Sequence, residues 1–312
     1  MRYFVKAMAM GLAALLSCAS ASYAKELKFI YVSHGQANDS FHSVVKNAAV
    51  KAAKDLGVEL DYRSPATFDM VAMAQLIDAA VNQKPDGLIV TIPDADALGP
   101  SIKRAVEAGI PVISTNSGQD ASKKLGVLLH VGQDEYIAGK KAGEKLKALG
   151  GKKGICVNVE PGNVSLDIRC KGFSDGFGGS VSVLSTSLDI PENISKIRAA
   201  LDSDPSIDTV LGTSAPHAGE SAVKAVEQAG REGKVHVATF DLSANFLQAI
   251  VAGKADFAID QQQYLYGYLP VVLLKLYNDY GLIPASDIAS GPLLVTRDKA
   301  AQVIKLSAQG IR

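Results

Sequence analysis

Along most of the chain, short apolar runs alternate with longer segments in which apolar residues recur every three or four positions. The first run is FIYV at 29–32, and the segment that follows, 40–57, has helical spacing and a stop at Gly57. Such runs are typical of buried strands, and the longer segments are typical of amphipathic helices. Because strands that alternate with helices indicate parallel sheets with helices on both faces, we predict an α/β fold.

The alternation restarts near Asp134, which predicts two α/β lobes of similar architecture. We expect strands at 27–33, 58–64, 88–92, 111–116, 128–132, 154–160, 180–187, 208–214, 235–241 and 255–261, and helices at 40–57, 68–84, 96–109, 135–150, 165–177, 194–204, 217–230 and 245–253. The alternation of strands and helices then ends at a long apolar helix, 263–281, and a tail follows from residue 290. This last part has to dock on a lobe, and we consider a return to the first one.

The N-terminus has the pattern of a secretory signal peptide. A basic start (Arg2, Lys6) precedes the apolar residues 7–16, and SYA at 22–24 is a small-x-small cleavage site. We therefore expect a signal peptide at 1–24 and a mature chain from residue 25. A rival interpretation is a lipoprotein signal, because LLSC loosely resembles a lipobox that would anchor the protein at Cys18.

Composition and missing motifs narrow the function. Hydrophobic residues make up 47% of the chain, which is enough for a real core. The formal net charge is zero, whereas nucleic-acid binders usually carry a basic surplus, so we expect no nucleic-acid partner. There is no CxxC, and the five histidines lack ligand spacing, so we expect no metal and no other cofactor. P-loop, GxSxG and HExxH motifs are missing from the sequence, so we do not expect an enzyme.

Removal of the signal peptide would leave two cysteines, Cys156 and Cys170. The first lies in a predicted strand and the second in the helix that follows. In an exported protein two such cysteines can form a disulfide. Two unpaired, buried thiols are the alternative, and the sequence leaves both open.

Polar side chains gather where the predicted strands end, which is where open parallel sheets bind ligands. The candidates are Ser33, His34, Thr91, Asn116, Arg169, Ser214, Asp241 and Gln261. Hydroxyls, amides, one carboxylate and one guanidinium suit a neutral ligand rich in hydroxyl groups. Two candidates also have simpler interpretations: Asp241 as the cap of a helix that starts near Ser243, and Arg169 as a surface arginine.

Seven segments carry a family resemblance: FIYVSHGQANDSFHSVVKNA, KPDGLIVTIPDADAL, AGIPVISTNS, HVGQDEYIAGKKAG, RCKGF, VATFD and AIDQ. Over residues 25–312 the chain resembles the periplasmic substrate-binding proteins of bacterial ABC importers, of the ribose-binding, type I class. The resemblance implies two Rossmann-like lobes with parallel sheets, joined by a three-segment hinge. It places the N-terminal lobe at 25–131 plus 263–291 and the C-terminal lobe at 132–262 plus 292–312.

The same resemblance implies roles for individual residues. Asp39 and Phe41 would contact the sugar from the first helix, with Phe41 as a stacking face. Other family ligand positions fall on Asn116, Arg169, Asp241 and Gln261. Ser117 and the pair Ala215-Pro216 depart from the ribose-type pattern, so the resemblance does not select a pentose. A Cys156–Cys170 disulfide would fix the segment that carries Arg169.

The function implied is capture of a sugar or polyol in the cleft between the lobes, in the periplasm, and delivery to an ABC permease in the inner membrane. We expect a monomer. The main alternative is a ligand-loaded partner of a chemoreceptor or sensor kinase. A sugar-responsive transcription regulator would need a helix-turn-helix where the export signal stands, and an exported enzyme would need a visible nucleophile–base pair.

Overall fold

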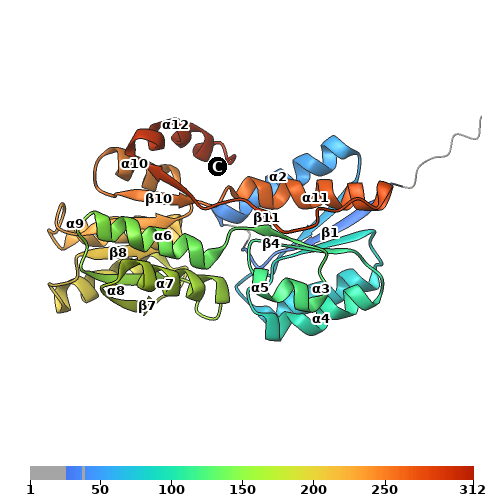
Figure 1. Cartoon of the computed structure of the whole chain (residues 1–312), viewed down its shortest axis with the longest axis horizontal. Coiled ribbons are helices and arrows are strands. Elements are labelled where there is room, and N and C mark those ends of the chain that lie inside the picture. The colour runs from blue at the N-terminus through green and yellow to red at the C-terminus, as the bar shows by residue number, and fades with distance from the viewer. Residues whose placement is uncertain (1–25, 37–38) are drawn as a thin grey trace, which may run out of the picture.

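The computed structural model describes residues 26–36 and 39–312. The chain folds into two α/β lobes that lie side by side along the long axis of the molecule (Figure 1). Each lobe is built on a six-stranded sheet with helices on both faces. The predicted α/β fold with two lobes is confirmed.

The first sheet has the strand order β11-β5-β4-β3-β1-β2, and its pairings are all parallel. Its strands are β1 (Lys28–Val32), β2 (Glu59–Arg63), β3 (Gly87–Val90), β4 (Val112–Thr115), β5 (His130–Gly132) and β11 (Ile288–Ala289). Helices α2 (Ser40–Leu56) and α11 (Gln263–Tyr280) pack on one face, and α3 (Met70–Asn82) and α4 (Ala95–Glu107) on the other. A short helix, α5 (Gln119–Ser122), and a 3-10 turn (Lys123–Leu125) follow β4.

The second sheet has the order β12-β10-β9-β8-β6-β7. Its strands are β6 (Lys153–Asn158), β7 (Ser180–Ser185), β8 (Thr209–Gly212), β9 (His236–Phe240), β10 (Phe257–Asp260) and β12 (Leu293–Thr296). Helices α6 (Glu135–Ala148) and α7 (Val164–Phe177) cover one face. The other face is covered by α8 (Ile190–Ser203), α9 (Glu220–Gln228), α10 (Ala244–Val251) and α12 (Arg297–Ala308).

Some local predictions differ from the structure. The edge strand β12 pairs antiparallel with β10, because the chain enters it from the other lobe and not from a crossover helix. The helix expected from 217 begins as a π-helical turn, Ala215–Gly219, before α9. The tail after β11 packs on the second lobe through Val295 and Ala300, so of the last part of the chain only the long helix returns to the first lobe. Strand β11 and helix α5 were not predicted, since both are too short to show a period.

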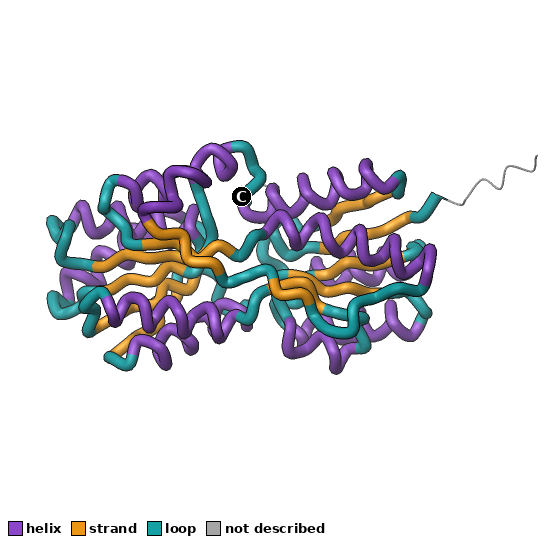
Figure 2. Tube along the Cα trace, turned by 45° about the horizontal axis from the view of Figure 1, so that its top comes forward, coloured by secondary structure: helices purple, strands orange, loops and turns teal. Residues whose placement is uncertain are grey.

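The chain crosses between the lobes three times (Figure 2). It crosses after β5, after β10 and between β11 and β12. The crossovers are tied together, because the side-chain amide of Gln262 donates to the carbonyl of Ser290, whose own N–H donates to the carbonyl of Gly132 2.9 Å away. Three connected segments therefore form one narrow junction. None of the helices in the described residues is long and apolar enough to cross a membrane.

Candidate functional site

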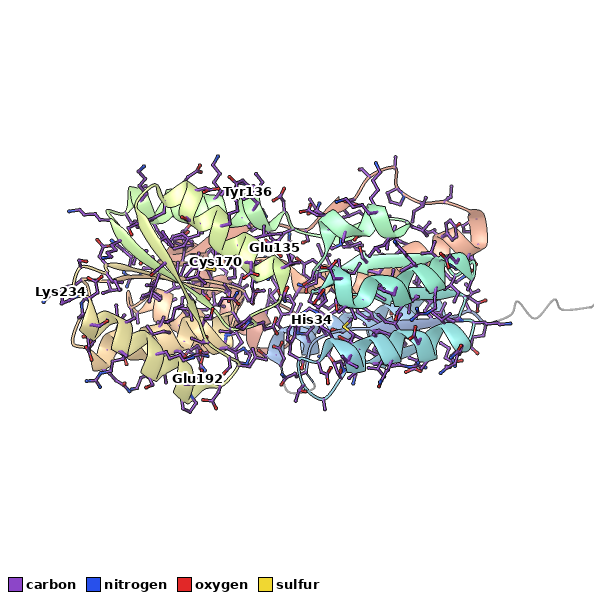
Figure 3. All side chains as sticks on the ribbon, turned by 90° about the horizontal axis from the view of Figure 1, so that it is seen from below. His34, Glu135, Tyr136, Cys170, Glu192 and Lys234 are labelled. Carbon is purple, nitrogen blue, oxygen red and sulfur yellow. A yellow bond between two sulfur atoms is a disulfide. The ribbon has the colours of Figure 1, made fainter. Side chains whose placement is uncertain are left out.

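A polar cavity lies between the lobes, at the carboxyl ends of the strands of both sheets. It holds about 410 Å³ of space not filled by atoms, part of it open to solvent. Most of the residues predicted from the sequence line it: His34, Asp39, Phe41, Asn116, Arg169, Ser214, Asp241 and Gln261. Figure 3 shows His34 and Glu135 near the junction of the lobes, whereas Lys234 lies at the far end of one lobe.

Two predicted residues, Ser33 and Thr91, stand behind the wall of the cavity instead of lining it. The Thr91 hydroxyl oxygen accepts a hydrogen bond from the His34 backbone N–H at 2.9 Å and lies 2.8 Å from His34 Nδ1. Ser33 Oγ accepts from the backbone N–H of Gly35 at 3.1 Å. Both side chains are turned onto the loop that follows β1, so they position that loop.

Arg169 is buried in the cavity wall, with only 3% of its surface exposed, so it is not a surface arginine. Its Nε and Nη2 donate to the two carboxylate oxygens of Glu135 at 2.7 and 2.9 Å, and its Nη1 donates to the Thr213 carbonyl at 2.9 Å. The guanidinium carbon lies 4.5 Å from the centre of the Phe240 ring. This two-pronged pairing fixes the guanidinium plane and compensates its charge in a buried place.

Close packing of α6 against α7 brings Glu135 and Arg169 together. A Cβ added at Gly139 would lie 2.2 Å from the carbonyl oxygen of Arg169, and one at Gly172 would lie 2.3 Å from that of Tyr136. Only glycine lets the two backbones approach so closely. Sequence reasoning missed Glu135 because it opens a helix instead of following a strand.

A disulfide joins Cys156 on β6 to Cys170 on α7, with the two Cα atoms 5.6 Å apart. Of the two alternatives left open by the sequence, the structure therefore has the pair. The bond ties the helix that carries Arg169 to β6, the strand beside the edge strand β7 of the second sheet.

Asp241 follows β9 in a left-handed backbone conformation, with φ of 70°. It does not cap the next helix, because Ser243 is the N-cap of α10 and accepts from the Phe246 N–H. Its carboxylate instead accepts a hydrogen bond from the Gln261 side chain. Burial raises the pKa of Asp241 to about 7, against the lowering effects of Arg169 and Gln261. Near neutral pH the carboxyl group is therefore partly protonated, so it can both accept a hydrogen bond from a ligand and donate one to it.

The wall on the first lobe is formed by the start of α2. Asp39 caps this helix by accepting from the Phe41 N–H at 2.9 Å, and Phe41 presents a largely buried ring to the cavity. His42, the next residue of the helix, is not among the candidate ligand residues, and it also lines the cavity. The only sequence feature that could have pointed to His42 is its position in the first turn of the helix, close to the N-cap residue Asp39.

Further polar residues of the second lobe, outside the candidate ligand residues, also line the cavity: Glu160, Asn163, Thr213 and His217. Asn163 Nδ2 donates to Glu160 Oε2 at 2.8 Å. Burial raises the pKa of Glu160, although its hydrogen bond with Asn163 and the charge of His42 oppose that change. Three of these residues lie in the loops that follow β6 and β8. Their position just after a strand is the sequence feature from which a place at the cavity could have been predicted.

The lobes touch across the cavity, which is therefore in a closed arrangement. The backbone N–H of Val164, the first residue of α7, donates to the carbonyl of Pro93 on the first lobe at 3.1 Å. Beside this contact, His34 Nε2 lies 3.9 Å from Glu160 Oε2. Among the described residues, no group of three or more His, Cys, Asp or Glu is arranged to hold a metal ion.

Two Rossmann-like lobes that close on a polar cleft through a three-segment junction define a two-lobed solute-binding protein. Residues 29–279 match the family model described as a periplasmic binding protein domain, and the chain belongs to this family. The resemblance seen in the sequence is confirmed.

Individual relatives agree with this assignment. A carbohydrate transporter from Acidothermus cellulolyticus 11B, solved in complex with myo-inositol, is 38% identical with a TM-score of 0.87, over 92% of this chain and 100% of that chain. The xylose/arabinose-binding protein XylF of Sulfolobus acidocaldarius is 25% identical over 80% of this chain and 66% of the relative. The fructose import binding protein FruE of Bifidobacterium longum is 26% identical over 73% and 72%. The chain thus spans about two thirds of the length of these two curated relatives.

Proposed function

We propose that this protein captures a sugar or polyol between its lobes and delivers it to an ABC-type importer. The observation that carries the proposal is the cavity between the lobes, in which a buried carboxyl group, amides and a fixed guanidinium surround a space beside the Phe41 ring. Ligand hydroxyls both donate and accept hydrogen bonds, so they match this mixed set of groups. An unmatched hydroxyl would leave a buried polar group unpaired, at a cost of about 1–3 kcal/mol.

Within this class, a cyclic polyol is the ligand that we favour. The relative from Acidothermus cellulolyticus is described with myo-inositol bound, and it is similar to this chain over nearly its whole length. The departures from the ribose-type pattern at Ser117 and Ala215-Pro216 also lie at or beside the cavity. A ligand other than a pentose is consistent with both observations.

The remaining parts of the proposal concern the whole protein. We propose that it acts in the periplasm as a monomer without enzymatic activity, and that its loaded form docks on an inner-membrane permease. The expected signal peptide at 1–24 and the alternative anchor at Cys18 lie outside the described residues. The proposed lobes are 25–131 plus 263–291 and 132–262 plus 292–312, which agrees with the sheet to which each strand belongs.

A thermal-melt screen against sugars, polyols and sugar acids tests the proposal. At a ligand concentration 100 times Kd, linkage predicts about 2.7 kcal/mol of stabilisation, which raises Tm by several degrees. We expect a cyclic polyol to give the largest shift and Asp241→Ala to remove it. If no sugar or polyol raises Tm at millimolar concentration, the carbohydrate proposal is wrong.

A further inference from the structure

His42 on α2 has a ring that is tightly held at the edge of the cavity. Only 8% of its surface is exposed. The His34 ring lies edge-on with its centre 4.8 Å away, and the Phe41 ring lies 5.1 Å away. Gly35 completes the enclosure, because a Cβ at that position would lie 1.8 Å from the Cγ atom of His42. The backbone of the β1 loop therefore lies directly against the imidazole and leaves it one orientation.

The two ring nitrogens of His42 have different surroundings. Nδ1 lies 2.6 Å from Asp39 Oδ2, so it donates its proton to that carboxylate. Nε2 is buried and has no hydrogen-bond partner among the described residues, although the residue lines the cavity. A buried polar atom without a partner is costly, and in a ligand cavity a ligand atom is the natural partner.

The charges around His42 favour its protonated form. Burial alone would lower the pKa of His42, but Asp39, through its charge and hydrogen bond, and the carboxyl groups of Glu160 and Asp241 raise it above the ordinary value of 6.5. By contrast, burial lowers the pKa of the two other histidines in the cavity, His34 and His217. Of these three histidines, His42 is thus the one whose surroundings favour a charged ring with an N–H on both nitrogens.

We propose that His42 is a specificity-determining residue whose Nε2–H donates a hydrogen bond to one hydroxyl oxygen of the bound polyol. The proposal rests on the function proposed above and assigns one ligand position to a residue outside the sites transferred from the family. The surrounding carboxyl groups of Asp39, Glu160 and Asp241 oppose an anionic oxygen at this point. The oxygen that His42 selects is therefore that of an uncharged hydroxyl group.

The test uses two variants that separate the ring nitrogens. In His42→Asn, the short amide can keep a donor near Nδ1 for Asp39 but has nothing at the position of Nε2. In His42→Gln, the longer amide can carry a donor toward the position of Nε2. Calorimetric titration with myo-inositol should show roughly ten- to hundred-fold weaker binding for His42→Asn and partial recovery for His42→Gln. Urea unfolding of both free variants checks that each is folded.

Deoxy-inositols, each without one hydroxyl group, distinguish direct contact from a structural role. In the wild-type protein, one of these compounds should bind about tenfold or more weakly than myo-inositol. In His42→Asn, the same compound should bind as well as myo-inositol. The variant has no N–H at the position of Nε2, so the hydroxyl group that the compound lacks would form no hydrogen bond there in any case. A purely structural role of His42 would weaken all the ligands by the same factor, and that result would overturn the proposal.

The pH dependence gives a second readout. The ratio of wild-type to His42→Gln affinity should fall as pH rises through the elevated pKa of His42, because the charged donor is lost. Taking a ratio reduces the contribution of groups whose titration does not depend on His42, whereas Glu160 interacts with His42 and shifts with it. If the wild-type protein binds myo-inositol and the affinity of His42→Asn for it is within twofold of the wild-type affinity, only the proposed role of His42 is wrong. If wild-type protein binds no polyol, the proposed function fails and this inference fails with it.

Discussion

At the scale of single residues, the cavity relies on buried charges that are fixed by neighbours. Arg169 has almost no exposed surface, and its guanidinium is held by Glu135, the Thr213 carbonyl and the Phe240 ring. Taking two charges out of water is costly, and their pairing offsets the cost only if both partners stay in place. The Arg169–Glu135 pair therefore orients the guanidinium in the cavity wall. Its disruption should lower both the free energy of unfolding and the affinity for the ligand.

Two substitutions of Arg169 distinguish the effect of its positive charge from the effect of its two-pronged pairing with Glu135. Arg169→Ala leaves the Glu135 carboxylate buried without its partner and should lower the free energy of unfolding by about 3–5 kcal/mol. Arg169→Lys keeps the charge but cannot reach both carboxylate oxygens, so we expect a smaller loss of stability and still weak ligand binding. Urea unfolding and calorimetric titration measure the two effects. Equal stability of wild type and Arg169→Ala would contradict the structural role of the pair.

Asp241 should give the stability of the free protein a distinct pH dependence. Its pKa is about 7 in the folded protein, against 3.8 ordinarily, so the folded state prefers the protonated form. The contribution of Asp241 is fully present below pH 4 and is lost as pH rises through 7. Asp241→Asn should therefore be more stable than wild type at pH 8, by at most about 4 kcal/mol, and the difference should vanish near pH 4. Chemical unfolding at several pH values measures it, and a difference independent of pH would contradict the assignment.

At the scale of elements, the site depends on how closely α6 and α7 pack. Glycines face the partner backbone on both helices: Gly139 and Gly143 on α6, and Gly172 and Gly176 on α7. Each would place a Cβ within 2.4 Å of a carbonyl oxygen of the other helix. The two backbones thus fit together without side chains between them, which sets the distance from Glu135 to Arg169.

Gly172→Ala should push the helices apart. Overpacking of this kind costs about 1–3 kcal/mol. It should also weaken ligand binding, because Arg169 moves with its helix. Gly99→Ala on α4 is a matched control, because its new Cβ would meet only the Leu125 side chain at 3.2 Å. There we expect a change within about 1 kcal/mol and unaltered affinity, since alanine is the better helix former. Similar effects of both substitutions would argue against the close-packing role.

At the scale of the whole molecule, the two lobes enclose the cavity and are connected by a narrow junction. Because the ligand contacts both lobes only when they are closed, binding shifts the balance toward the closed arrangement. The hydrogen bond from the Val164 N–H to the Pro93 carbonyl exists only when the lobes meet. Removing this hydrogen bond should therefore shift the equilibrium between the open and closed arrangements without changing the fold of either lobe.

Val164→Pro tests this contact with little disturbance of the fold. Val164 is the first residue of α7, where proline is well tolerated, and Asn163 before it has the extended backbone that proline requires. The substitution removes the N–H, so we expect roughly three- to tenfold weaker ligand binding with little change in unfolding free energy. Val164→Ala, which keeps the N–H, is the control. Small-angle scattering should show less compaction on ligand addition for the proline variant; equal affinity of both variants would show that the contact does not stabilise closure.

The sequence by itself determined the alternation of strands and helices, the two lobes and most of the cavity wall. Apolar periodicity reports local burial directly, and the carboxyl ends of parallel strands meet at one edge, so Asn116 and Asp241 could be placed from strand ends. Arg169 lies within α7, and its placement also drew on the RCKGF segment of the family resemblance.

The tertiary structure decided which polar side chains turn inward and which partners they meet. Ser33 and Thr91 follow the same rule as the others, yet they point into the β1 loop, while His42 reaches the cavity because Asp39 and Gly35 fix its ring. Glu135 reaches Arg169 from a helix 34 positions away along the chain. The contacts of Thr91 and Glu135 depend on the packing of segments distant in sequence, and those of Ser33 and His42 on the exact path of a loop; local periodicity encodes neither.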